Sequence, residues 1–408
     1  MLKKLLEHKF FKDSFWTMAA LCLLNVTIQF LIYPFINTIL GAEKYGNILV
    51  LISIVNIIAV SVGISVNNRR MVASAFTVTT NTEYNIFLLI ICIVLLPISV
   101  GITSALHLEM NIVESLLFWL LICCTMWRYY ADVEFRLNLN YKGYFKYYFF
   151  ISIGYLIGMF VFKVTKIWIL MMLPGELAGL IYIVLKGSLF KFQKISLNTF
   201  KAFLKAVIFL ILAQLLVQIV FNADRFILKL FSGGVAVTIY YIASLMGKTV
   251  ALLTTPINSV IIGYLAKSKK EMTIKRWNGI TGLCLMIGGG ILCACMVASH
   301  IFIRILYPNE FKDASPLFLL ANLAQIIYFV TGILTTVLLR YVKEKYQLYI
   351  NIAYVFVFSI MVIPFTWKYG IWGFAYAILT VNLFRFFYVF ILMASKIHRK
   401  EISSYKLG

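Results

Sequence analysis

The stretch YYIASLMGKTVALLTT, residues 240–255, is apolar over most of its length and carries one charged side chain, Lys248, near its middle. As an α-helix it would extend about 24 Å, which is most of the roughly 30 Å thickness of the hydrocarbon core of a bilayer. A charged side chain at that depth costs at least about 2.5–3.5 kcal/mol on insertion scales. The sequence therefore predicts that Lys248 lies inside a membrane, in surroundings that compensate its charge.

Apolar runs of similar length recur along the whole chain. The protein has 408 residues, of which 62% are hydrophobic and 13% are charged, and its mean hydropathy is +0.94. These values lie outside the usual range of soluble globular proteins and predict an all-α membrane protein. Twelve runs are long enough to cross a bilayer as helices, and the connections between them are too short for a soluble domain. The runs begin near Ser14, Tyr45, Ile86, Ile112, Lys146, Ile167, Phe203, Thr238, Gly279, Ala314, Leu348 and Ile371.

The distribution of basic residues predicts the orientation of the chain. The net charge is +22, and most Lys and Arg residues fall in alternate connections, beginning with the N-terminal segment. Because cytoplasmic loops are enriched in Lys and Arg, both termini are predicted to lie in the cytoplasm. The basicity thus sets the membrane topology, and it does not indicate a nucleic-acid partner.

Two segments indicate an internal repeat. NVTIQFLIYPFI, which begins at Asn25, and QLLVQIVFNADR, which begins at Gln214, both place polar residues at i, i+4 and i+8. When the two segments are overlaid without gaps, Gln29 coincides with Gln218. Each segment is followed by a short connection that contains glycine and by a Tyr that opens the next run. The repeat begins where a second set of six helices would begin.

This repeat indicates that the twelve spans are two copies of six. The first lobe is predicted at 1–190 and the second at 203–408, with a cytoplasmic linker at 191–202. The linker belongs to a basic amphipathic stretch that could also lie on anionic lipid at the membrane surface.

The surroundings of Lys248 form a polar stripe along one face of its helix. The spacing 3, 4, 7, 3 places Tyr241, Ser244, Lys248, Thr255 and Asn258 on this face. One interpretation is structural: Lys248 pairs with a carboxylate of another helix. The other is functional: Lys248 lines a wet cavity, and the remaining stripe residues help to bind a substrate. We favour the second, because one ion pair would not explain the whole stripe.

The preceding run repeats the pattern with Gln214, Gln218, Asn222 and Arg225 on one face, next to Asp224. Asp224 is a candidate for ion coupling. The amides are candidates for substrate binding, although interhelical hydrogen bonding would also explain them.

The first run contributes Asn25, Gln29 and Tyr33. If the halves are related by pseudo-symmetry, the first, seventh and eighth runs would line one central space.

Two further basic residues lie inside predicted spans. Arg128 could pair with Asp132 at i+4, reach the cytoplasmic interface, or bind substrate. Arg385 lies deeper, with Asn382 and Tyr388 one turn away on either side, and could line a cavity or bridge two helices.

Glu176, two residues after Pro174, is a carboxylate inside a predicted span. It could bind and release a proton and so couple transport to an ion, or it could pair with a basic residue. The chain has no Walker A motif, and its four His residues lack metal-ligand spacing, so we predict a protein that is not an enzyme and that has no metal or other cofactor.

Three segments carry a resemblance to a known family. They are FLIYPFINTILGAEKYGNILVLISI (30–54), NADRFILKLFSGGVAVTIYYIASLM (222–246) and RILYPNEFKDASPLFLLANL (304–323). In these segments and in its twelve-span layout the chain resembles the bacterial polysaccharide flippases of the O-antigen (Wzx) type, which belong to the multidrug/oligosaccharidyl-lipid/polysaccharide exporter superfamily.

The resemblance implies two pseudo-symmetric six-helix lobes around a central cavity, which opens alternately to either side of the bacterial plasma (inner) membrane. It implies that the protein flips an undecaprenyl-pyrophosphate-linked oligosaccharide to the outer face, for O-antigen, lipopolysaccharide or capsule assembly. Its partners would be this substrate, membrane lipids, and a polysaccharide polymerase with its chain-length regulator. Lys248 and the stripe that contains Gln218 match helices that line the cavity of the family, and Arg128 matches less closely. A drug or cation antiporter of the same superfamily, or a membrane glycosyltransferase or polymerase, remains as an alternative.

Overall fold

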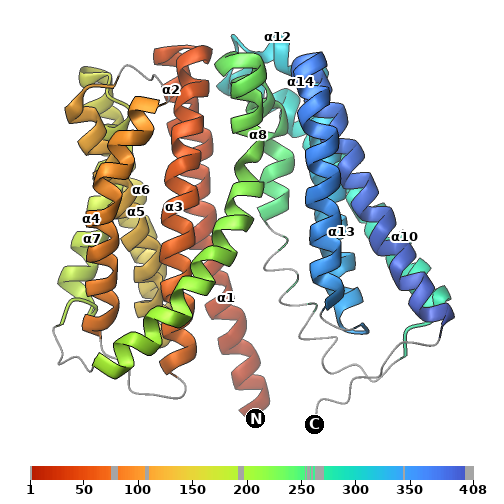
Figure 1. Cartoon of the computed structure of the whole chain (residues 1–408), viewed down its shortest axis with the longest axis horizontal. Helices are drawn as coiled ribbons and strands as arrows, with labels where there is room; N and C mark the ends of the chain where they lie inside the picture. Colours follow the sequence, from red (N-terminus) through yellow and green to blue (C-terminus); the bar gives the residue numbers. More distant parts are fainter. Residues whose placement is uncertain are drawn as a thin grey trace. The chain divides into compact units, whose positions relative to one another are not determined.

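The computed structural model describes residues 2–74, 81–105, 110–191, 197–252, 254, 258, 261, 271–342 and 345–399, and within them every regular element is helical (Figure 1). Thr255 and residues 192–196 of the predicted linker lie outside these residues. The elements are α1 (Leu2–Val26), the π-helix η1 (Thr27–Ile32), α2 (Tyr33–Leu40), α3 (Ala42–Ser74), α4 (Asn81–Ala105), α5 (Ile112–Leu137), α6 (Tyr141–Thr165), α7 (Ile169–Lys186), α8 (Leu197–Leu252), α10 (Ile274–Ala298), the π-helix η2 (Ser299–Ile303), α11 (Arg304–Leu306), α12 (Phe311–Ala314), the 3₁₀-helix η3 (Ser315–Leu317), α13 (Phe318–Leu339) and α14 (Lys345–His398).

Ten helical segments of the described residues are long and apolar enough to cross a membrane. The predicted all-α membrane fold is therefore confirmed at this level. The count of twelve spans stays a prediction. Two of the ten, within α8 and α14, are 49 and 54 residues long, and a straight helix of 54 residues would measure about 80 Å.

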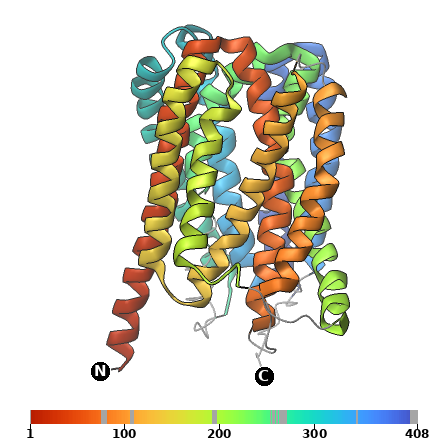
Figure 2. The same ribbon diagram turned by 90° about the vertical axis from the view of Figure 1, so that its left-hand side faces the viewer.

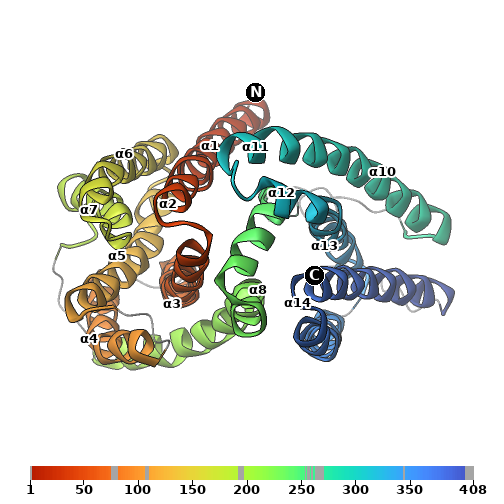
Figure 3. The same ribbon diagram turned by 90° about the horizontal axis from the view of Figure 1, so that it is seen from above.

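Both long helices fold back on themselves at a glycine. Gly233 in α8 has φ 81° and ψ 178°, and Gly370 in α14 has φ 56° and ψ −139°, conformations that favour glycine. Across the α14 turn, the Tyr354 hydroxyl donates to Asn382, 28 residues further along the chain. A straight helix would separate these residues by about 40 Å, so the two arms lie against each other (Figure 3).

The chain divides into two compact units. The first comprises residues 1–41 and 47–223, and the second comprises residues 42–46 and 224–408. The first arm of α8 therefore begins in one unit and ends in the other. These units are a different division from the predicted six-helix lobes, which stay a prediction.

In the first unit, α1 and α4 to α7 run side by side (Figure 2). Glycines bring α6 and α7 close together. A Cβ atom built on Gly158 would lie 2.0 Å from the Met171 carbonyl oxygen, and one on Gly154 would lie 2.6 Å from the Gly175 Cα. Such approaches are possible only without a side chain, which is how small residues support packing between membrane helices.

A glycine with positive φ follows each of the two segments that suggested a repeat. Gly41, after the segment from Asn25, has φ 80° and ψ 166°, and Gly233, after the segment from Gln214, has φ 81° and ψ 178°. The repeat itself stays a prediction.

In the second unit, α13 packs against both α10 and α14 (Figure 1). The short segment 42–46 belongs to this unit because Glu43 caps the arm of α8 that follows Gly233. The Glu43 carboxylate accepts hydrogen bonds from the N–H groups of Gly234 (3.2 Å) and Val235 (2.9 Å). A carboxylate at this position satisfies two unpaired donors and complements the positive end of the helix.

Candidate functional site

An ion pair between α5 and α7 lies in the interior of the first unit. Arg128 Nε lies 2.9 Å and 3.1 Å from the two carboxylate oxygens of Glu176, and the side chains are 6% and 1% exposed. The Tyr155 hydroxyl of α6 also donates to Glu176, at 2.6 Å. Arg128 is therefore buried, and its side chain binds Glu176 instead of extending to the cytoplasmic interface of the membrane. Both oxygens of Glu176 are engaged.

The predicted i+4 pair of Arg128 with Asp132 does not form. Asp132 instead accepts hydrogen bonds from the hydroxyls of Tyr144 (3.1 Å) and Tyr148 (3.1 and 3.2 Å), and it lies 3.8 Å from Arg136. The reason is that α5 packs against both α6 and α7: Arg128 meets Glu176 of α7, whereas Asp132 meets tyrosines of α6. The roles predicted for Arg128 in substrate binding and for Glu176 in ion coupling stay predictions.

The second unit contains a polar cluster between the two arms of α8. Lys248 pairs with Asp224, a residue 24 positions earlier that the turn at Gly233 brings alongside. Their side chains are 19% and 13% exposed, so the pair is only partly enclosed. The Asp224 Oδ1 atom is buried without a hydrogen-bond partner, since Lys248 binds Oδ2. Lys248 thus has a carboxylate partner among the described residues, and its role in substrate binding stays a prediction.

Tyr241 supplies an aromatic face to two cations of this cluster. The Arg225 guanidinium lies 5.4 Å and the Lys248 ammonium 6.0 Å from the centre of the Tyr241 ring. The ring is 4% exposed. Attraction by the negative face of an aromatic ring stabilises a cation that has left water.

Arg385 of α14 is held by aromatic rings rather than by a carboxylate. Its guanidinium lies 4.8 Å from the ring centre of Tyr328 on α13 and 5.2 Å from that of Tyr354 on the other arm of α14. Asn382 fixes this arrangement, because it accepts from the Tyr354 hydroxyl at 3.3 Å and donates to the Ala324 carbonyl at 2.9 Å. Among the described residues no carboxylate lies within 4.0 Å of Arg385.

The charges of the second unit do not balance inside its long helices. From Asp224 onward, α8 together with α10, α13 and α14 contains a single carboxylate residue, Asp224 itself. Outside their terminal turns the same helices hold five basic residues: Arg225, Lys229, Lys248, Lys368 and Arg385. Lys229 pairs with Glu43 and Lys248 pairs with Asp224, so positive charge exceeds negative charge in these helices. This excess is the main electrostatic feature of the unit.

The remaining predicted residues have separate local arrangements. In the first unit, Asn25 donates to the Leu21 carbonyl (2.8 Å) and Asn222 donates to the Gln218 carbonyl (2.9 Å). These bonds stay within one helix and do not join neighbouring helices.

Two more residues of the predicted set are partly exposed in the first unit. Gln214 is half-buried in the first arm of α8, and Gln29 is half-buried in the π-helix η1. Stretches of π-helix occur often at functional sites. In the second unit the buried Ser244 hydroxyl donates to the Tyr241 carbonyl at 3.2 Å. The substrate-binding role of each of these residues stays a prediction.

Sequence reasoning missed two buried polar residues. Arg70 of α3 donates to the Tyr130 hydroxyl at 2.7 Å and bonds the Asn81 side chain. Asn322 of α13 is fully buried and bonds α8. A polar residue inside a long apolar run was the available signal for Asn322, whereas Arg70 stands in the polar sequence NNRR, which is typical of a connection between spans.

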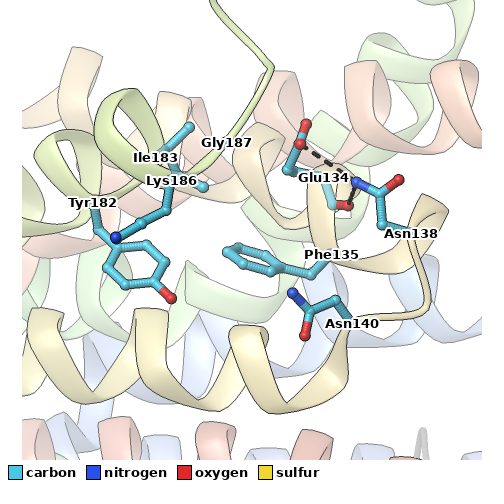
Figure 4. Close-up of a pocket in the computed structure, with 8 residues that line it drawn as sticks. All are labelled: Glu134, Phe135, Asn138, Asn140, Tyr182, Ile183, Lys186 and Gly187. Atoms are coloured by element: carbon cyan, nitrogen blue, oxygen red, sulfur yellow. Dashed lines mark hydrogen bonds between the residues drawn. The ribbon is translucent and has the colours of Figure 1, made fainter.

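A small polar cavity of about 90 Å³ lies in the first unit, where α5 ends and α7 ends (Figure 4). Glu134 forms one wall and accepts from the Ser188 N–H (3.0 Å) and hydroxyl (2.9 Å). The volume corresponds to about three water molecules, so the cavity is too small for an oligosaccharide. The lining residues are Glu134, Phe135, Asn138, Asn140, Tyr182, Ile183, Lys186 and Gly187. Elsewhere in the described residues, no three His, Cys, Asp or Glu side chains gather as metal ligands would.

Comparison with solved structures places this arrangement in a known fold. The lipid II flippase MurJ, in an inward closed conformation, matches with a TM-score of 0.71 and 13% identity, over 93% of this chain and 87% of that one. An inward-facing MATE multidrug resistance transporter of the MOP superfamily matches with a TM-score of 0.61 and 14% identity, over 95% and 99% of the two chains. The chain has the MOP fold.

A third MOP structure, a transporter from Pyrococcus furiosus, matches with a TM-score of 0.61 and 14% identity, over 97% of this chain and 96% of that one. Its description says that a reverse polarity of the binding pocket suggests a different function. Neither a protein-family model nor the sequence of a curated protein matches this chain. The fold of the predicted superfamily is thus confirmed, and membership of that superfamily and the O-antigen type stay predictions.

Proposed function

We propose that this protein is a flippase that moves an undecaprenyl-pyrophosphate-linked oligosaccharide from the cytoplasmic to the outer face of the bacterial plasma membrane. The observation that carries the proposal is the excess of positive charge in the second unit, where Asp224 is the single carboxylate residue of helices that hold Arg225, Lys248 and Arg385. Cations in a membrane interior need a compensating anion, and a diphosphate is such an anion.

Arg385 and Lys248 would bind a diphosphate in different ways. Arg385 has no carboxylate partner among the described residues, and the rings of Tyr328 and Tyr354 cover it, so its N–H edge is the part that can donate. Lys248 is neutralised by Asp224. A diphosphate would therefore bind first to Arg385 and gain Lys248 only by competing with Asp224. This competition would make binding reversible, which transport requires.

The other parts of the substrate would meet other surroundings. Amide and hydroxyl groups of the predicted set would form hydrogen bonds with the sugars, and the polyprenyl chain would stay in lipid. No bond of the substrate is made or broken, so the process is transport without catalysis. Alternating access would expose the bound diphosphate first to the cytoplasm and then to the outer side.

A drug or cation antiporter is the second candidate, and the multidrug transporters that share the fold favour it. A cationic substrate would need an available carboxylate in the second unit. Asp224 offers only its Oδ1 atom, because Lys248 occupies Oδ2. Binding of a cation there would have to displace or tolerate Lys248, which makes this function the weaker candidate.

The testing experiment measures the sidedness of lipid-linked oligosaccharide in cells that lack the protein. The cells are complemented with wild type, Lys248→Ala, Arg385→Ala or the control Lys312→Ala, whose side chain is exposed on α12. We expect wild type and the control to clear the intermediate from the cytoplasmic face. Arg385→Ala should fail most strongly, because it removes the anchor that no carboxylate neutralises.

Two outcomes would contradict the proposal. If no lipid-linked intermediate accumulates in cells that lack the protein, the substrate assignment is wrong. If the cells instead become sensitive to cationic drugs and Asp224→Asn reproduces this sensitivity, the antiporter function is correct. The proposal also includes cytoplasmic termini and a polysaccharide polymerase and chain-length regulator as partners for O-antigen or capsule assembly, which protease protection and cross-linking in cells would test.

A further inference from the structure

Asn322 of α13 joins three helical elements through one fully buried amide. Its Oδ1 atom accepts a hydrogen bond from the Gly247 N–H of α8 at 2.7 Å. Its Nδ2 atom donates to the Ala243 carbonyl of α8 (3.3 Å), to the Ser299 hydroxyl at the start of the π-helix η2 (3.2 Å) and to the Phe318 carbonyl of α13 (2.8 Å). The side chain has no exposed surface.

The two α8 groups that Asn322 binds belong to the same helical rung. In a regular α-helix the N–H of residue i bonds the carbonyl of residue i−4, which pairs Gly247 with Ala243. The Asn322 amide supplies an acceptor to one group and a donor to the other, at 2.7 and 3.3 Å. A side chain that inserts at such a rung is a known cause of local helix bending. The rung lies immediately before Lys248.

A glycine makes this insertion sterically possible. A Cβ atom on Gly247 would lie 2.8 Å from the Gln325 Cβ, 3.0 Å from the Asn322 Oδ1 and 3.1 Å from the Asn322 Cα. Any larger residue at 247 would push α13 away. The close approach at Gly247 and the hydrogen bonds of Asn322 therefore together fix the rotation of this part of α8 about its own axis.

We propose that Asn322 is a positioning residue that sets the direction of the Lys248 ammonium toward Asp224. A long side chain ends about 6 Å from the helix axis, so a rotation of α8 by about 10° displaces its tip by about 1 Å. A displacement of that size decides whether an ammonium group keeps a direct hydrogen bond to a carboxylate. Asn322 fixes this rotation through its hydrogen bond with Gly247, the residue that directly precedes Lys248. The effect of Asn322 on substrate binding rests on the proposed function, whereas its effect on the direction of the Lys248 side chain does not.

The test measures the position of Lys248 by zero-length cross-linking. A lipid-soluble carbodiimide joins a carboxylate and an amine that are in contact, and peptide mass spectrometry gives the yield of the Asp224–Lys248 amide. The full-length protein in lipid nanodiscs is used, as wild type, Asn322→Ala and the matched control Thr331→Val. Thr331 lies on the same helix and is buried, but its hydroxyl bonds only the Ile327 carbonyl of its own helix.

The exposed pair of Glu43 and Lys229, 3.3 Å apart in the same unit, serves as the internal standard in every sample. We expect Asn322→Ala to lower the ratio of the Asp224–Lys248 yield to the Glu43–Lys229 yield by at least about tenfold, because contact is lost on displacement by about 1 Å. Thr331→Val should leave this ratio unchanged. An unchanged ratio in Asn322→Ala would overturn the inference.

A second variant covers the case in which Asn322→Ala does not fold. Gly247→Ala keeps the amide but forces α13 and α8 apart, so it should lower the same ratio. An unchanged ratio in folded Gly247→Ala would overturn the inference equally.

Binding of undecaprenyl diphosphate to the same nanodiscs separates this inference from the proposed function. If wild type does not bind and the cross-link ratio falls in Asn322→Ala, the positioning role stands and the proposed function is wrong. If wild type binds and the ratio does not fall, the proposed function stands and the positioning role is wrong. If both stand, Asn322→Ala should weaken binding no further in a Lys248→Met background, because it acts through Lys248.

Discussion

Removing one member of the Arg128–Glu176 pair should destabilise the protein far more than removing both. The side chains are 6% and 1% exposed, and each Glu176 oxygen lies within 3.1 Å of Arg128 Nε. In Glu176→Gln the guanidinium stays buried without a counter-charge, and loss of one partner of a buried pair costs about 3–5 kcal/mol. The double variant Arg128→Met, Glu176→Leu leaves no charge unpaired, so its cost should be about 1–2 kcal/mol, or less.

The free energy of unfolding would be measured by reversible denaturation in mixed micelles, with tryptophan fluorescence as the signal. Tyr155→Phe removes one hydrogen bond to the carboxylate and should cost about 1.5–3 kcal/mol. The control is Lys229→Ala, which breaks a pair whose side chains are 35% and 53% exposed and should cost at most about 1 kcal/mol. If the double variant lost as much as the two single variants together, the two charges would not be coupled and the reasoning would be refuted.

Three further predictions concern other parts of the molecule. Gly158→Ala should lower the unfolding free energy by about 1–3 kcal/mol, because its Cβ would lie 2.0 Å from the Met171 carbonyl oxygen. The control Gly101→Ala has open space around the new Cβ and should not destabilise the protein. Equal effects of the two substitutions would contradict the packing argument. Glu43→Ala should cost about 1 kcal/mol through loss of the helix cap, measured in the same way, and a neutral result would mean that the cap contributes nothing. Undecaprenyl diphosphate at about 100 times its dissociation constant should raise the stability of wild type by about 2.7 kcal/mol, and Arg385→Gln should abolish most of this gain in a thermal-shift measurement.

Features that depend on composition and on hydrophobic periodicity were predicted well from the sequence. Membrane helices follow from long apolar runs, because a bilayer admits only backbone that is fully hydrogen-bonded. The repeat suggested by the segments at Asn25 and Gln214 stays a prediction, although a glycine of similar conformation follows each of them. The fold-back of α14 at Gly370 was implied by the need for two spans there, although the glycine itself was not singled out.

Partner assignments were the weak point, because they depend on how helices pack. Arg128 had an obvious candidate in Asp132, one turn away, and the structure instead pairs it with Glu176, 48 residues away on α7. Periodicity gives the face of a helix on which a residue lies, but it does not give the helix that this face meets. Asn322 escaped notice for the same reason, since its importance comes from Gly247 and Ala243 on another element.

Arg128 and Arg385 have contrasting surroundings, and this contrast supports the proposed function. In the first unit Arg128 is matched by Glu176, and the carboxylate has all the partners it needs, as a purely structural pair would. In the second unit Asp224 pairs with Lys248, whereas Arg385 lies against two aromatic rings and, among the described residues, has no carboxylate within 4.0 Å. Burying a cation without an anion is costly, so such a residue is an expensive way to hold helices together. It becomes favourable when an anion arrives from outside the chain, and a diphosphate carried on a lipid can reach it.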